Sequence, residues 1–364
     1  MKRIVLVQAV GCVESGARVV LKELLTKVPD KLDMLVLCSS HVAREVVGGN
    51  FGKVGANAYV VGLPHRFFGR WLRVPLEIMI ALAAATRILR RVVNLSHYGL
   101  CWGGDYVLYI HNLLLMDMKQ PQGWSQGRPN ALNRFMLNTC VRRSTMLVLQ
   151  TNYTASQLKA YCAAHGLPLP RHRIVRPKVG TIRHKSEVRQ IPAPDRRFSF
   201  QLFYPTSRFS HKRINLAMSA ARLVHNEDVD VGLIITVDGC EGTAACNDGV
   251  HCIGVVTRQE IFALYATVDA LLFTSELESL GLPIVEAIEF GLPVIAPRLP
   301  YAVELLGDAG CYFDGDTPDA VVRAVCECRK NFGIYKVRIA RRSDEFRKEA
   351  LTWEEHWPVL LGEA

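Results

Sequence analysis

Residues 275–295 read SELESLGLPIVEAIEFGLPVI, and this stretch predicts a short helix that leads directly into a buried strand. Pro283 suits the first turn of a helix, where its missing N–H needs no partner. Gly291 suits the position just past a helix end, and Pro293 stands where proline cannot continue the helix. The sequence therefore marks both ends of this helix.

The alternation of strand and helix extends on both sides of this stretch. Continuous apolar runs, which are typical of parallel strands covered on both faces, separate segments with helical periodicity. Such alternation predicts an α/β fold with parallel, doubly wound sheets and right-handed crossovers. We expect strands at residues 4–8, 34–38, 106–110, 146–150, 198–204, 231–237, 270–273 and 293–296, and helices at residues 16–26, 214–225, 258–265 and 283–290.

Residues 179–197 separate the two halves of the chain. This segment is basic, contains prolines and has neither helical nor strand periodicity, so we expect it to be a linker. We assign residues 1–190 to an N-terminal domain and residues 198–345 to a C-terminal domain. A length of 364 residues suits two α/β domains.

The N-terminus and the cysteines favour a cytoplasmic protein. The apolar run after Met1 has the length of a strand and turns polar at Gln8, so no signal peptide is expected. The 11 cysteines are scattered and include no C-x-x-C pair, which indicates a reducing compartment and no structural metal.

Charge is distributed unevenly between the two halves. Residues 1–190 contain 27 Lys and Arg against 9 Asp and Glu, whereas residues 191–364 contain 17 against 25. This asymmetry predicts an anionic partner for the first half, either a membrane surface, a nucleic acid or a phosphate-bearing acceptor. Nucleic acid is the weakest of the three, because no aromatic residues are interleaved with the cations.

An apolar run at residues 74–85 has arginines at both ends and is interrupted by Glu77. A bilayer requires roughly 20 apolar residues, so this run is too short to cross one. It is either an interfacial helix at an anionic membrane or a buried helix with exposed arginines. The arginines in question are Arg66, Arg70, Arg73, Arg87, Arg90 and Arg91.

The loop and helix at residues 275–295 have the chemistry of a diphosphate site. Gly281 allows the backbone to approach a ligand, and N–H groups at a helix start bind phosphate. Glu286 can accept hydrogen bonds from ribose hydroxyls, and Glu278 can reach a sugar. Earlier in the chain, Arg208 and Lys212 follow an expected strand, where fixed cations would stabilise a departing diphosphate; solvated loop cations are the alternative.

With these two motifs the sequence resembles the retaining GT-B glycosyltransferases of family 4, also called glycosyl transferases group 1. The resemblance rests on Glu278 and Glu286, separated by seven residues around a Gly-Leu-Pro segment. It implies two Rossmann-like domains that face each other across a cleft, and donor phosphates bound by the backbone at Ser279, Leu280, Gly281 and Leu282. It also implies catalysis by Glu278, Arg208 and Lys212 without a cofactor or a metal.

The resemblance suggests further positions. Asp238 lies in a turn where relatives often bind the donor, and Val256 and Thr257 match a segment near the nucleotide base, although ordinary turn chemistry would explain all three. His111 stands at a strand end where family members carry a catalytic histidine, and Gly16 closes a glycine-bearing loop after the first strand. A last helix within residues 346–364, which carries tryptophans, resembles the one that returns to the N-terminal domain.

Two Asp-x-Asp pairs are similar to a metal motif of another glycosyltransferase fold. Asp228 and Asp230 precede a strand, and Asp314 and Asp316 lie in a polar turn, so neither pair is expected to bind metal. The function that the resemblance implies is transfer of a hexose or deoxyhexose from a nucleotide-diphosphate sugar. The expected acceptor is a glycan or polyprenyl-diphosphate-linked oligosaccharide of a surface polysaccharide (lipopolysaccharide O-antigen, capsule or exopolysaccharide), at the cytoplasmic face of the inner membrane. The alternatives are a GT-B epimerase or phosphorylase, or a basic nucleic-acid-binding protein.

Overall fold

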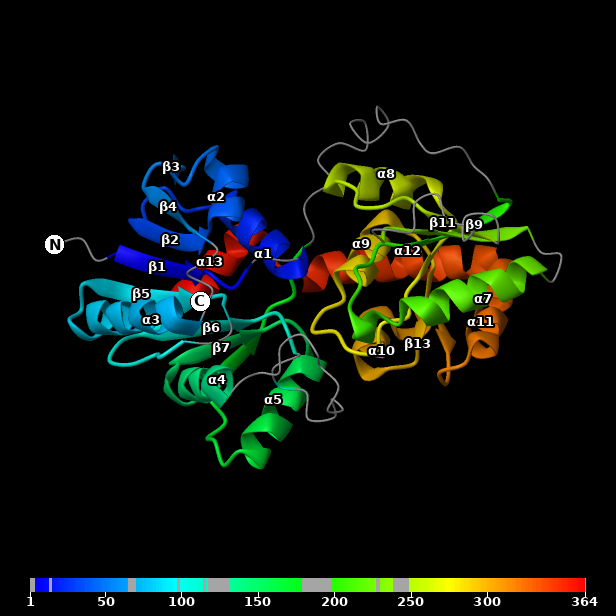
Figure 1. Cartoon of the computed structure of the whole chain (residues 1–364). Coiled ribbons are helices and arrows are strands. Elements are labelled where there is room, and N and C mark those ends of the chain that lie inside the picture. The colour runs from blue at the N-terminus through cyan, green and yellow to red at the C-terminus, as the bar shows by residue number, and fades with distance from the viewer. Residues whose placement is uncertain are drawn as a thin grey trace. The chain divides into compact units, whose positions relative to one another are not determined.

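A computed structural model describes residues 4–12, 15–64, 70–96, 99–113, 116, 131–178, 198–226, 230–237 and 249–363. The chain divides into two compact units (Figure 1). The first unit consists of residues 1–178 together with residues 350–364, and the second of residues 179–349. The expected linker at residues 179–197 lies outside the described residues.

The first unit is built on an eight-stranded sheet in the order β3-β4-β2-β1-β5-β6-β7-β8. Every pairing is parallel except that of β3 with β4. Its strands are β1 (Ile4–Ala9), β2 (Met34–Ser39), β3 (Phe51–Val54), β4 (Ala58–Leu63), β5 (Leu89–Asn94), β6 (Tyr106–Ile110), β7 (Met146–Leu149) and β8 (His172–Ile174). Its helices are α1 (Ser15–Leu25), α2 (Ser40–Val47), α3 (Arg70–Ala85), α4 (Ala131–Arg143), α5 (Asn152–Ala164) and α13 (Trp353–Leu361).

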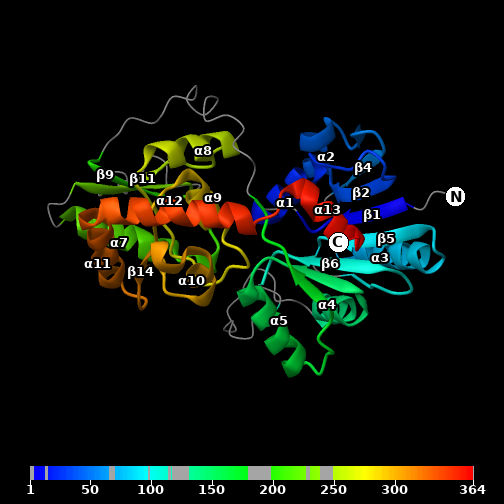
Figure 2. The same ribbon diagram turned by 180° about the vertical axis from the view of Figure 1, so that it is seen from behind.

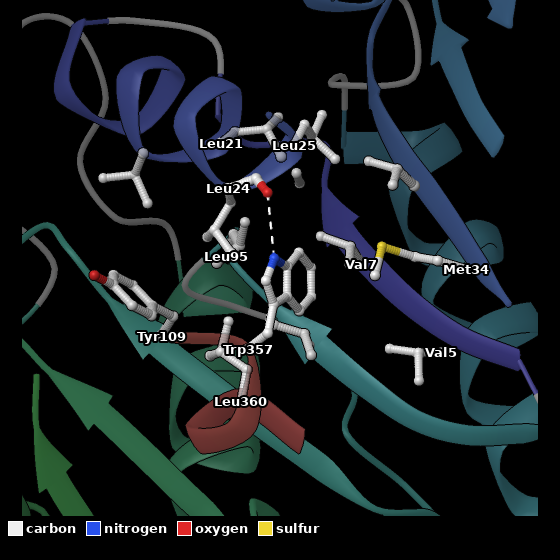
Figure 3. Packing of buried hydrophobic residues seen from close by; sticks show 14 of the residues in the cluster. Val5, Val7, Leu21, Leu24, Leu25, Met34, Leu95, Tyr109, Trp357 and Leu360 are labelled. Atoms are coloured by element: carbon white, nitrogen blue, oxygen red, sulfur yellow. Dashed lines mark hydrogen bonds between the residues drawn. The ribbon is translucent and has the colours of Figure 1, made fainter. Parts of the chain in front are cut away.

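The last helix of the chain completes the core of the first unit. Figures 1 and 2 both show α13, in red, beside the blue α1. Trp357 is buried among side chains of α1 and the central strands, and its indole N–H donates a hydrogen bond to the carbonyl oxygen of Leu24 at 3.3 Å (Figure 3). Val5 and Val7 of β1 belong to this core. Gln8 points to the other side of the sheet, where it contacts Glu77 of α3.

The second unit has a six-stranded, fully parallel sheet in the order β11-β10-β9-β12-β13-β14. Its strands are β9 (Phe200–Tyr204), β10 (Val231–Ile235), β11 (Val250–Cys252), β12 (Ala270–Leu272), β13 (Val294–Pro297) and β14 (Gly310–Phe313). Its helices are η2 (Ser210–Lys212), α7 (Ile214–Asn226), α8 (Arg258–Thr267), α9 (Leu282–Phe290), α10 (Pro300–Leu306), η4 (Gly307–Ala309), α11 (Pro318–Lys330) and α12 (Phe332–Glu349).

This strand order defines a doubly wound sheet with a topological switch point. In chain order the strands of the second unit run 3-2-1-4-5-6, so the winding direction reverses between β9 and β12. Ligands of such sheets bind beyond the carboxyl ends of the strands at this point. In the first unit the corresponding point lies between β1 and β5.

The α/β fold with two parallel, doubly wound sheets is confirmed, and three boundaries need correction. Helix α12 continues to Glu349, so residues 346–349 belong to the second unit. The returning helix begins only at Trp353, where Thr352 and Glu355 form a capping box. Gly16 lies within the first turn of α1, which begins at Ser15, and not in the preceding loop. Among the described residues, no helix has the length and apolar character needed to span a membrane.

Candidate active site

Helix α9 begins at the glutamate-bearing loop of the second unit. Gly281 is its N-cap, with φ at 70°, a left-handed conformation that strains any residue with a Cβ. This cap provides no side chain to bind the N–H groups of the first turn. Pro283 lies in that turn and Gly291 ends the helix at φ 63°, as the sequence predicts. The start of α9 is thus suited to an anionic ligand.

Glu278 and Lys212 form an ion pair in the second unit. The ammonium nitrogen of Lys212 lies 2.5 Å from Oε1 of Glu278, and the two side chains are 17% and 13% exposed. Lys212 ends η2, which follows β9, whereas Glu278 lies in the loop after β12. The pair therefore lies at the topological switch point of the sheet.

Backbone carbonyls of η2 fix this arrangement. The carbonyl oxygen of Lys212 accepts hydrogen bonds from the hydroxyls of Tyr204 at 2.7 Å and Thr274 at 2.9 Å. The backbone N–H of Glu276 donates to the carbonyl oxygen of His211 at 2.9 Å. These bonds connect the two loops on either side of the switch point, so the Lys212–Glu278 pair is held from both strands.

Glu286 is buried and has two partners on α8. Its carboxylate accepts a hydrogen bond from the Tyr265 hydroxyl at 3.0 Å and lies 3.2 Å from the guanidinium of Arg258. Burial, followed by the charge of Glu286, raises the pKa of Tyr265 well above its ordinary value, so the phenol keeps its proton. Arg258 and Tyr265 were not among the residues expected in the site. Their seven-residue spacing, two helical turns on one face of an expected helix, is the signal that could have indicated them.

The other expected donor-binding residues lie in several environments. Arg208 is exposed on the loop between β9 and η2. Ser279 and Leu280 are buried, and Leu282 is half-buried in the first turn of α9. Val256 is half-buried, and Asp238 lies outside the described residues.

Thr257 has a local structural role. Its hydroxyl accepts a hydrogen bond from the backbone N–H of Glu260, whose carboxylate accepts the N–H of Thr257 in return. This capping box starts α8 and thereby positions Arg258 at its first residue. The side chain of Thr257 is therefore the N-cap of α8.

The aspartates of the two Asp-x-Asp pairs that the structure describes have other partners. Asp314 pairs with Arg298 at 3.1 Å, and Asp316 with Arg213 at 2.6 Å. Asp230 accepts the backbone N–H of Ser199 at 2.9 Å, and Asp228 lies outside the described residues.

In the first unit, His111 and the loop after β1 lie at the carboxyl ends of β1, β5 and β6. The backbone N–H of Gly11 donates to the hydroxyl of Ser96 at 2.8 Å, and a Cβ on Gly11 would lie 3.3 Å from that side chain. Nε2 of His111 lies 2.8 Å from the carbonyl oxygen of Leu95. Because a carbonyl only accepts, Nε2 carries the proton and Nδ1 is the basic nitrogen. Burial lowers the pKa of His111 to about 4, so its imidazole is neutral at pH 7.

The arginines around α3 do not act as one group. Arg73 is buried, with Nε 3.7 Å from Oε1 of Glu77. This corrects the expectation that Arg73 contacts a membrane. Arg91 pairs with Asp105 at 2.5 Å and donates to the carbonyl oxygen of Leu360 at 3.2 Å, so it too stabilises the fold.

The remaining arginines of that set lie in different environments. Arg90 pairs with Glu363 at 2.8 Å and keeps 46% of its side chain exposed. Arg87 is exposed, and Arg70 begins α3. Arg66 lies outside the described residues.

Comparison with known proteins identifies the fold first. HepE of Anabaena, solved in complex with UDP-glucose, superimposes with a TM-score of 0.71 at 16% identity, over 99% of this chain and 100% of that chain. The two Rossmann-like units therefore define the GT-B fold of glycosyltransferases. Residues 202–331 match the sequence model of glycosyl transferases group 1.

Curated relatives match over a shorter stretch. The serotype-specific mannosyltransferase WbdA of Escherichia coli is 35% identical over 106 residues, which are 29% of this chain and 12% of that protein. The O-antigen chain mannosyltransferase B of Escherichia coli is 27% identical over 105 residues, 29% of this chain and 27% of that protein. The match thus spans only a small part of each relative's length.

Proposed function

We propose that this protein is a retaining, metal-independent glycosyltransferase that uses a nucleotide-diphosphate sugar as its donor. The observation that carries the proposal is the Lys212–Glu278 pair at the switch point of a group 1 domain, directly before the glycine-capped start of α9. A cation, an acid and helix N–H groups in these neighbouring loops support the proposal, because together they can bind a sugar diphosphate.

Each group has a role in donor binding. The first turn of α9 accepts the diphosphate, whose charge increases as the glycosyl bond breaks. Lys212 and Arg208 stabilise that charge, which makes a divalent metal unnecessary. Glu286 accepts hydrogen bonds from the ribose hydroxyls, and Arg258 and Tyr265 keep its carboxylate in place. Glu278 binds the hydroxyls of the transferred sugar.

The first unit is proposed to bind the acceptor. Neutral His111, with Nδ1 as its basic nitrogen, can accept a hydrogen bond from an acceptor hydroxyl. No residue is required as a nucleophile, because the departing phosphate oxygen can take the acceptor's proton on the face from which it leaves. Such front-side attack retains the configuration of the donor sugar.

The names of the relatives suggest a mannosyl donor and a surface polysaccharide product. Both curated relatives are mannosyltransferases of Escherichia coli, one described as serotype-specific and the other as acting on the O-antigen chain. We therefore propose that the chain transfers mannose, or a related hexose or deoxyhexose, to a growing O-antigen, capsule or exopolysaccharide. A polyprenyl-diphosphate-linked acceptor would place the reaction at the cytoplasmic face of the inner membrane.

A nucleotide-release assay tests this proposal. The purified chain is incubated with GDP-mannose, UDP-glucose and other nucleotide sugars in turn, with and without a lipid-linked mannose-containing acceptor. Release that depends on both donor and acceptor, with an α-linked product by NMR, is the expected result. Release or rearrangement of the donor without acceptor would indicate an epimerase or phosphorylase instead. Failure of every donor to bind would exclude a nucleotide-sugar enzyme.

A further inference from the structure

Lys212 is followed by a residue whose backbone lies in the left-handed region. Arg213 has φ 51° and ψ 46°, and it is the C-cap of η2, where its N–H donates to the carbonyl oxygen of Ser210 at 3.0 Å. This conformation is uncommon for a residue with a Cβ, and it costs free energy that the surrounding contacts have to offset. The turn that carries Lys212 therefore ends at a strained position.

The backbone around this position is fixed by hydrogen bonds from the sheet and from α7. The hydroxyl of Thr274 lies 2.9 Å from the carbonyl oxygen of Lys212 and 3.2 Å from that of Arg213. The Tyr204 hydroxyl donates to the Lys212 carbonyl, and the N–H of Leu216 donates to the Arg213 carbonyl at 3.0 Å. These bonds determine the orientation of the peptide unit that joins Lys212 to Arg213.

The side chain of Arg213 connects η2 to two other loops. Its Nη1 lies 2.6 Å from Oδ1 of Asp316, in the turn between β14 and α11, and its Nε lies 4.0 Å from Oε2 of Glu276, in the loop after β12. The loops after β9, β12 and β14 all lie at the carboxyl edge of the sheet, where a doubly wound sheet binds its ligand. Arg213 thus joins three loops at this edge.

The choice of residue at position 213 is informative. A glycine would adopt the left-handed conformation without strain. An arginine gives up this advantage, so its side chain has to contribute something that glycine does not provide. The contribution that the structure shows is the ion pair with Asp316, together with the weaker contact to Glu276.

We propose that Arg213 is a positioning residue that fixes the direction of the Lys212 side chain. Its ion pair with Asp316 keeps η2 in its tight turn, so that the ammonium group of Lys212 faces Glu278. Arg213 does not contact the donor in this scheme, because its guanidinium is paired with acids of the neighbouring loops. The inference rests on the proposed function, in which Lys212 stabilises the departing diphosphate.

Crystal structures of variants test the positioning itself and need no donor. In Arg213→Ala the left-handed backbone remains unfavourable and the ion pair is lost, so η2 should change its conformation. The ammonium nitrogen of Lys212 should then lie beyond ~4 Å, the limit of an ion pair, from the carboxylate of Glu278. Arg298→Ala, which removes a different ion pair to the same turn, is the matched control and should leave the Lys212–Glu278 pair in place. An unchanged pair in Arg213→Ala would overturn the proposal.

Kinetics separate positioning from loss of the fold. Asp316→Asn should lower kcat by roughly two- to fivefold, as expected for an ion pair with an exposed acid, and Arg213→Ala by roughly tenfold or more. The KM for the donor should change much less, because the contact of Lys212 with the diphosphate strengthens as the glycosyl bond breaks. Asp314→Asn, two residues away in the same turn, should retain the kcat of the wild type. Thermal melts ensure that each variant is folded at the assay temperature.

Combination with Lys212→Ala shows whether Arg213 acts through the lysine. In that background Arg213→Ala should have little further effect on kcat, whereas Arg213→Lys, which keeps the charge, should lose less than Arg213→Ala does. Additive losses, or equal losses in Asp316→Asn and Asp314→Asn, would overturn the proposal. If no nucleotide sugar reacts with the wild type, the proposed function fails, and the crystal structures alone decide whether Arg213 positions Lys212.

Discussion

The ammonium group of Lys212 and the carboxylate of Glu278 are 2.5 Å apart and follow neighbouring strands, β9 and β12. Each residue thus neutralises the charge of the other. Under the proposed function, a donor exchanges this contact for two others, phosphate with Lys212 and sugar hydroxyls with Glu278. The exchange keeps Lys212 paired with a negative charge and Glu278 hydrogen-bonded, which limits the desolvation cost of donor binding.

The first prediction concerns this pair. Glu278→Ala should reduce turnover at least ~100-fold, because it removes a group close to the reacting sugar. The melting temperature should fall as well, because Lys212 loses its partner at a largely buried position, so turnover is compared well below the transition. Steady-state kinetics with thermal melts check the prediction, and Asp314→Ala, which removes an exposed ion pair, serves as control. Normal turnover in Glu278→Ala would exclude this residue from the site.

The second prediction separates Glu286 from the residue that positions it. Glu286→Ala should reduce kcat/KM at least ~100-fold, whereas Tyr265→Phe removes one hydrogen bond to the carboxylate and should cost about tenfold. Tyr265 is buried and phenylalanine has nearly its shape, so the fold should be maintained.

Titration with donor, monitored by isothermal calorimetry, shows whether Tyr265→Phe lowers kcat/KM by weakening donor binding. In Tyr265→Phe the loss should appear mainly in donor affinity, because the carboxylate is present but less well oriented. In the Glu286→Ala, Tyr265→Phe double variant, the tyrosine change should have no further effect. Additive losses would show that Tyr265 does not act through Glu286.

The third prediction concerns metal. Treatment with EDTA should leave glycosyl transfer unchanged, because Lys212 and Arg208 provide the positive charge near the leaving diphosphate. Activity is measured by nucleotide release before and after chelation, and again after addition of Mg²⁺ or Mn²⁺. Loss on chelation with recovery on metal addition would contradict the proposed role of the two cations.

The fourth prediction is a pH dependence of stability that arises at Glu77. Burial raises the pKa of Glu77 from 4.5 to about 7. Between these values the folded state holds a proton that the unfolded state releases, so the free energy of unfolding falls as pH rises through this window. The shift corresponds to about 3 kcal/mol in total.

Glu77→Gln keeps the shape and removes the titration. Urea unfolding of this variant and the wild type at several pH values between 4.5 and 7 gives the difference in stability, which should grow with pH in favour of the variant. Glu45→Gln, at an acid with exposed ion pairs and a lowered pKa, should not show this trend. If the free energies of unfolding of Glu77→Gln and of the wild type vary with pH in parallel, Glu77 is not the source of the pH dependence.

The predictable parts of the fold are those with a local sequence signal. Helix α9 was predictable because proline and glycine mark its ends, and the central strands because they are buried on both faces. Strand β5 was missed because its sequence LRRVVN has arginines at its second and third positions. One of them, Arg91, is accommodated at a strand position only through Asp105 and the backbone of α13, which a local pattern does not reveal.

In the site too, local sequence patterns could be recognised, whereas contacts that depend on packing could not. Glu278 and Glu286 lie on one continuous segment, so their spacing could be seen in the sequence. Arg258 and Tyr265 reach Glu286 only because α8 packs against α9. Likewise, the six arginines near α3 look equivalent in the sequence, and only packing separates buried Arg73 from exposed Arg87.

The position of α13 in the first unit also constrains how the chain folds during synthesis. Trp357 fills a core whose strands all come from the first 174 residues, yet it is synthesised only after the second unit. At a translation rate of ~5 to 20 residues per second, Trp357 is synthesised on the order of 10 s after the last strand of the first unit. The nascent first unit must therefore persist with an open apolar groove while the entire second unit, residues 179–349, emerges and can already close its own sheet.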